Sequence, residues 1–70
     1  MEYELPILIE YEEDEDVYLA ECPVLSGCYT DGKTYEEAYN NIKDAIKLMI
    51  EARLAVGDPI PTFEMVRIAA

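Results

Sequence analysis

The spacing of apolar residues changes near Thr34, from every second residue to every third or fourth. Before that point, Tyr3 to Tyr11 carries apolar residues at odd positions and glutamates at several even ones, which is the period of a half-buried strand. After it, apolar residues recur with the period of an amphipathic helix. The chain is therefore predicted to pair strands first and then to pack a helix on their sheet.

The first two strands flank an acidic run. Pro6 cannot donate a ladder hydrogen bond, so the strand Tyr3–Tyr11 is expected at a sheet edge or with a bulge. Five adjacent acids repel one another, so the run Glu12-Glu13-Asp14-Glu15-Asp16 is expected to be a hairpin loop. Residues 17–22 then return as a second strand that carries apolar residues on both faces.

A third strand and a turn complete the predicted sheet. Residues 22–28 contain the turn formers Pro23 and Gly27, and a short strand over residues 28–30 ends at the turn dipeptide Asp31-Gly32. The three strands are expected to form an antiparallel meander.

The helix has predictable ends. Thr34 and Glu37 form a capping box, while Gly57 is placed to cap a helix that runs to about Val56, with Pro59 and Pro61 preventing its continuation. The stripe expected to pack on the sheet consists of Tyr35, Ala38, Tyr39, Ile42, Ala45, Ile46, Met49 and Ile50.

The last apolar stretch, Phe63 to Ile68, is predicted to be a fourth strand, which gives a single α+β domain over residues 1–70 with the order β-β-β-α-β. One helix covers only one face of a sheet, so apolar surface should remain uncovered. Such patches mark self-association or partner surfaces, and tyrosines such as Tyr11 and Tyr18 are favoured there. The alternative is a set of scattered single exposures.

The net charge of the chain limits the classes of molecule that it is expected to bind. Sixteen acidic and five basic residues give a net charge of -11, which repels phosphate backbones and argues against direct nucleic-acid binding. The same surplus favours encounter with a basic protein, with plain solubility as the alternative. No apolar run approaches the roughly 20 residues of a membrane span, and the chain start does not resemble a signal peptide. A cytoplasmic location is expected.

No cofactor, metal site or catalytic centre is predicted. The acidic run lacks the glycine and ligand spacing of a calcium loop, so a solvated loop or a partner-facing loop is favoured over a metal site. The chain has no histidine, and Cys22 and Cys28 have no neighbour that would lower a thiol pKa. They are expected to be structural thiols.

The segment from Glu21 to Ala38, ECPVLSGCYTDGKTYEEA, resembles the signature of HicB-like antitoxins, and residues 41–46, NIKDAI, continue it. The family pattern is a Pro-Asp-Leu-Pro-Gly-Cys turn, a Gly-x-Thr-x-Glu-Glu-Ala helix start and an Asn-x-x-Glu-Ala-Ile continuation. This chain departs from it at Val24, Ser26 and Asp44.

The resemblance implies a partly degraded RNase H-like fold and a partner, the HicA toxin, a small basic ribonuclease silenced when its active site is covered. The partner-binding residues expected on this basis are Tyr11, Glu12, Glu13, Asp14, Glu15, Asp16 and Tyr18. Complete HicB antitoxins usually carry a further DNA-binding domain, and none is expected within these 70 residues.

Two alternatives to the antitoxin function stay open. One is an orphan scaffold or small-ligand binder that forms dimers or tetramers without a toxin. The other is a metal-dependent nuclease, which is disfavoured because its carboxylates would have to come from separate strands, whereas here they cluster in one loop.

Overall fold

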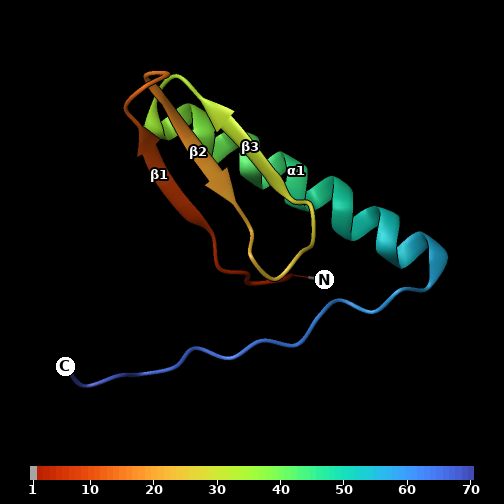
Figure 1. The fold of residues 1–70 in the computed structure, drawn as a ribbon. Coiled ribbons are helices and arrows are strands. Elements are labelled where there is room, and N and C mark those ends of the chain that lie inside the picture. The colour runs from red at the N-terminus through yellow and green to blue at the C-terminus, as the bar shows by residue number, and fades with distance from the viewer. Residues whose placement is uncertain (1) are drawn as a thin grey trace.

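Three strands and one helix follow one another in the computed structural model, which describes residues 2–70 (Figure 1). They are β1 (Leu8–Glu12), β2 (Val17–Glu21), β3 (Tyr29–Gly32) and α1 (Tyr35–Val56). The strands form one antiparallel sheet in the order β1-β2-β3, so β1 and β3 are both edge strands. The predicted α+β class, the meander and the edge position of the first strand are confirmed.

The acidic run forms the β1–β2 hairpin, as predicted. Glu12 pairs with Val17, which leaves a four-residue loop, and the loop closes at Asp16 in a left-handed backbone conformation with φ of 53°. β1 begins only at Leu8, later than the predicted start at Tyr3. Pro6 lies just before this start and has no N–H to donate to a ladder.

The third strand differs from its prediction. Asp31 and Gly32 are not a turn, because they pair with Leu19 and Tyr18 at the end of β3. The reason for a glycine here is steric: a Cβ on Gly32 would lie 2.4 Å from the backbone nitrogen of Ala38 in α1. The glycine allows the first turns of the helix to approach the sheet closely.

Both predicted helix ends are confirmed. The backbone N–H of Glu37 donates to Thr34 Oγ1 at 3.0 Å, and the Glu37 carboxylate accepts from the N–H of Lys33 at 3.3 Å. At the other end Gly57 adopts a left-handed conformation, with φ of 80°, and its N–H is directed at the carbonyls of Arg53 and Leu54. These local interactions set the length of α1 independently of the sheet.

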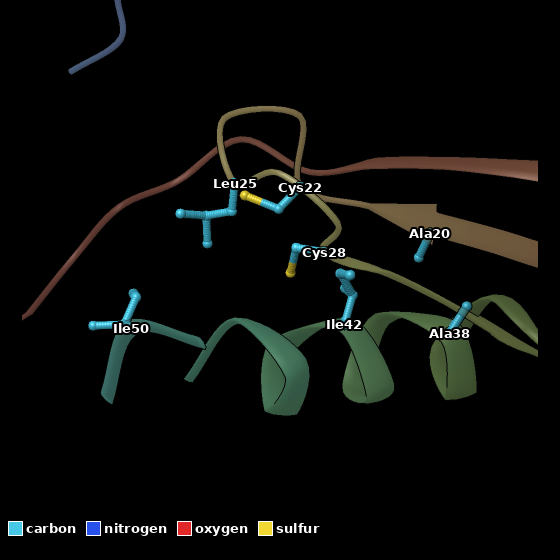
Figure 2. Packing of buried hydrophobic residues seen from close by; sticks show 7 residues of the cluster. All are labelled: Ala20, Cys22, Leu25, Cys28, Ala38, Ile42 and Ile50. Carbon is cyan, nitrogen blue, oxygen red and sulfur yellow. The ribbon is translucent and has the colours of Figure 1, made fainter. Parts of the chain in front are cut away.

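The core lies between the sheet and α1, and Figure 2 shows the side chains that fill it. Its buried members are Ala20, Cys22, Leu25, Cys28, Ala38, Ile42 and Ile50. The predicted helical stripe is confirmed in its central part but is wrong for Tyr35 and Tyr39, which are exposed. The burial of Leu25 is not predicted from the sequence, because a leucine within a Pro-Gly turn gives no periodic signal.

The predicted fourth strand is absent. Among the described residues no strand follows α1, and Phe63 to Ile68 is an extended segment that runs back along the domain without joining its sheet (Figure 1). Met65, Val66 and Ile68 are 81%, 76% and 75% exposed. A strand exists only where a neighbouring strand accepts and donates its backbone hydrogen bonds, and composition alone does not supply one.

Candidate functional site

The hairpin between β1 and β2 carries the partner-binding residues predicted from the sequence. Tyr11 and Tyr18 lie directly opposite each other across the two strands, with ring centroids 5.2 Å apart. The Tyr18 ring meets Tyr35, at the start of α1, edge-on at 6.2 Å. The hairpin end of the molecule is therefore a tyrosine cluster beside an acidic turn.

Two hydrogen bonds order this turn. The Tyr11 hydroxyl donates to Asp16 Oδ1 at 2.6 Å, and the backbone N–H of Asp14 donates to Glu12 Oε1 at 3.1 Å. Glu13 and Glu15 are exposed and project from the same loop. All seven predicted residues thus gather at one end of the domain, although the Tyr11–Asp16 bond has no counterpart in the sequence pattern.

The pKa of Tyr11 is raised, first because its hydroxyl donates to the Asp16 carboxylate, and then through partial burial and the negative charge of Asp16. A raised folded-state pKa means that the stabilisation is fully present below the ordinary tyrosine pKa and is lost as pH rises through the folded one. We expect Asp16→Asn to return the Tyr11 pKa toward its ordinary value, measured by NMR titration of the ring. An unchanged Tyr11 titration in the variant would contradict the hydrogen bond.

The face of the sheet opposite α1 is a second charged surface. On this face apolar and acidic residues alternate both along the strands and across them. Glu21 lies between Leu8 and Tyr29 in the ladder, and Leu19 lies between Glu10 and Asp31. A shallow hollow of about 240 Å³ lies on this face. An uncovered face is predicted from the sequence, but its acidic pattern is not, because the pattern depends on the register of all three strands.

A larger groove, of about 760 Å³, runs between the N-terminal segment and one side of α1. Tyr3, Leu5 and Ile7 form one wall, and the other wall is formed by Tyr39, Lys43, Asp44, Ile46, Lys47, Ile50, Glu51 and Leu54. The groove exists because α1 packs mainly on β3 and β2 and covers β1 much less. Half-buried apolar side chains therefore line an open channel at the β1 edge.

The chemistry of the remaining polar groups is limited. Within residues 2–70, no three histidine, cysteine, aspartate or glutamate side chains gather where they could hold a metal ion. Cys22 and Cys28 are free and buried, and burial raises the pKa of the Cys28 thiol, with a further contribution from Cys22. Such a thiol is protonated at neutral pH and is a poor nucleophile. Along the described chain, α1 lacks the apolar character needed to cross a bilayer.

The fold and this surface define a small acidic α+β domain with one helix on a three-stranded meander. Over residues 5–69 the chain matches the family described as HicB-like antitoxin of bacterial toxin–antitoxin systems. The chain belongs to this family, as the resemblance in its central segment predicted. Membership supports an antitoxin role and implies a toxin partner in general.

The chain is also similar to several proteins named UPF0150. One from Synechocystis sp. is 42% identical over 64 residues, which cover 91% of this chain and 80% of the relative. One from Thermoplasma acidophilum is 47% identical over 49 residues, covering 69% of this chain and 71% of the relative. One from Helicobacter pylori is 54% identical over 39 residues, which cover 56% of this chain and 54% of the relative. No solved structure matches the chain.

Proposed function

We propose that this chain is an antitoxin that binds a small basic ribonuclease of the HicA type in the cytoplasm and neutralises it by covering its active site. Family membership over residues 5–69 is the observation that carries this proposal. The net charge of -11 supports it, because an acidic surface attracts a basic toxin and competes for the site that would hold RNA phosphates.

The hairpin end is the part of the surface best suited to this contact. Glu13, Asp14 and Glu15 present charge without a cationic partner in the same loop, and Tyr11 and Tyr18 present ring faces beside it. Tyrosines supply apolar contact area together with a polar tip, while rim charges set the rate of encounter. The two kinds of residue would thus play different parts in one interface.

The direct test is inhibition of a purified HicA-type toxin from the same genome, with RNA cleavage as the readout. Stoichiometric addition of the chain should abolish cleavage, and the two proteins should elute together from a sizing column. Full cleavage in the presence of excess chain, together with separate elution, would refute the antitoxin proposal. It would leave the scaffold or small-ligand alternative.

The part played by the acidic turn is tested by Glu13→Gln, Asp14→Asn and Glu15→Gln combined in one variant. We expect the association rate with the toxin to fall about tenfold and to lose most of its salt dependence, since steering weakens as charge is removed. The measurement is stopped-flow binding at several salt concentrations.

A matched control removes three exposed acids outside the hairpin, one before β1, one near the end of α1 and one just after it, through Glu2→Gln, Glu51→Gln and Asp58→Asn. It changes the net charge by the same amount and should slow association much less. Equal slowing in the two triple variants would mean that net charge alone, and not the position of the hairpin, sets the rate.

A further inference from the structure

We propose that the C-terminal segment, Phe63–Ile68, binds a second copy of this chain by adding a strand to the free edge of β1, so that two copies exchange these segments. The first observation is that this segment pairs with no strand of residues 2–70, and that three of its apolar side chains, Met65, Val66 and Ile68, are each at least three-quarters exposed. Clusters of exposed apolar residues of this kind mark association surfaces.

The second observation is a matching vacant edge. β1 pairs with β2 on one side only, so the backbone groups on its outer side have no ladder partner. An extended peptide that joins such an edge gains main-chain hydrogen bonds and places alternate side chains on the two faces of the sheet. The groove lies beside this edge, between α1 and the residues that lead into β1, including Leu5 and Ile7. A strand added there would cover it.

Charge fixes which side of the segment faces the groove. Arg67 shares a face with Phe63 and Met65, whereas Glu64 shares the other face with Val66 and Ile68. On the open face the charged residues of β1 and of its neighbour β2 are all acids, whereas the groove contains both Lys43 and Lys47 along with acids. Arg67 therefore belongs over the open face near Glu10, and Val66 and Ile68 belong in the groove.

The connection to the segment favours exchange over docking within one chain. Ile60 packs against the core, and the Arg53 side chain donates to the carbonyl of Pro59 at 3.4 Å, so the start of the connection is held on the body. Pro59 and Pro61 restrict the backbone on either side of Ile60 to extended conformations. After this stiff stretch the chain turns back along the domain but stays apart from its own sheet (Figure 1). Exchange of an identical element is a common route to dimers.

The segment also suits a second copy electrostatically. Two bodies that each belong to a chain of charge -11 repel one another, but Phe63–Ile68 carries one acid and one base and is neutral. It is the stretch that can cross to an acidic neighbour without adding repulsion.

Size measurement by light scattering tests the exchange on the full chain. The wild-type chain should be a dimer at high micromolar concentration, and Val66→Glu with Ile68→Glu should raise the dimer dissociation constant at least a hundredfold while the helical circular dichroism is retained. The matched control is Leu48→Glu with Val56→Glu, which places the same charges at equally exposed helical positions outside the groove. It should leave the dimer intact. A monomeric wild-type chain, or a dimer insensitive to the segment variant, would refute the proposal.

A second measurement separates exchange from docking within one chain. In a mixture of isotope-labelled and unlabelled chains, isotope-filtered NMR should show contacts from the Val66 and Ile68 methyl groups of one chain to Ile46 of the other. The same contacts confined to one chain would overturn the proposal. The face assignment predicts that Arg67→Glu weakens the dimer about tenfold, that Glu10→Lys in the same chain restores it, and that Lys33→Glu, with the same charge change elsewhere, has little effect. Neither experiment involves a toxin, so its failure is distinct from failure of the antitoxin proposal.

Discussion

A Gly32→Ala variant is expected to lose about 3 kcal/mol or more of stability, because its methyl group would meet the backbone of α1 and not a movable side chain. The ideal Cβ position lies 2.4 Å from the nitrogen and 2.8 Å from the Cα of Ala38. A single small core supplies only about 3–5 kcal/mol in a domain of this size. Thermal unfolding followed by circular dichroism should therefore show a largely unfolded variant at room temperature.

The matched control for this prediction is Gly57→Ala at the helix C-cap. It adds the same methyl group where nothing lies within 4 Å, and it costs only the left-handed backbone strain of alanine, about 1 kcal/mol. That loss corresponds to about 4–8 °C in Tm for a chain of this length. If Gly32→Ala melted no lower than Gly57→Ala, the start of the helix would be free to move away from β3.

The second large effect is expected for Ile42→Ala. Ile42 is fully buried at the centre of the helix face that packs on the sheet, so removal of its side chain leaves a cavity that the small core cannot easily close (Figure 2). Such truncations cost about 2–5 kcal/mol. Urea unfolding at a fixed protein concentration measures the loss.

Leu48→Ala makes a fitting control for Ile42→Ala, since Leu48 lies six residues further along the same helix and is 67% exposed. Its cost should stay within about 0.5 kcal/mol, as for other surface substitutions. Equal losses for the two variants would mean that α1 presents a different face to the sheet.

The elements that the sequence predicts well are those with local causes. The bounds of α1 follow from the Thr34 cap and the Gly57 stop, and the hairpin follows from repulsion within the acidic run. The end of β3 was predicted wrongly because Gly32 has two physical explanations, a turn or a close approach, and only the position of Ala38 decides between them. Sequence neighbours do not contain that information.

The prediction of a fourth strand is wrong for a related reason. Phe63–Ile68 has the composition of a strand, but strand formation depends on a free edge in the right place, which is a property of the assembled sheet. The candidate site likewise combines features that the sequence predicts with features that depend on the assembled sheet. The acidic turn is visible in the sequence, whereas the Tyr11–Asp16 bond and the alternation of Glu10, Leu19 and Asp31 depend on strand register.

The two cysteines that flank the loop between β2 and β3 also make opening of the core measurable. The N–H of Cys22 donates to the carbonyl of Cys28 at 2.9 Å, which closes the neck of the loop. Both cysteines are buried in the core, 1% and 3% exposed, with the Cys28 sulfur directed at α1 and the Cys22 sulfur at Leu25 (Figure 2). A thiol reagent can therefore reach them only when this part of the core opens. The rate at which the native protein is alkylated therefore reports how often this part of the core opens. Because the two native thiols are the probe, the measurement can be repeated with and without toxin and at different protein concentrations.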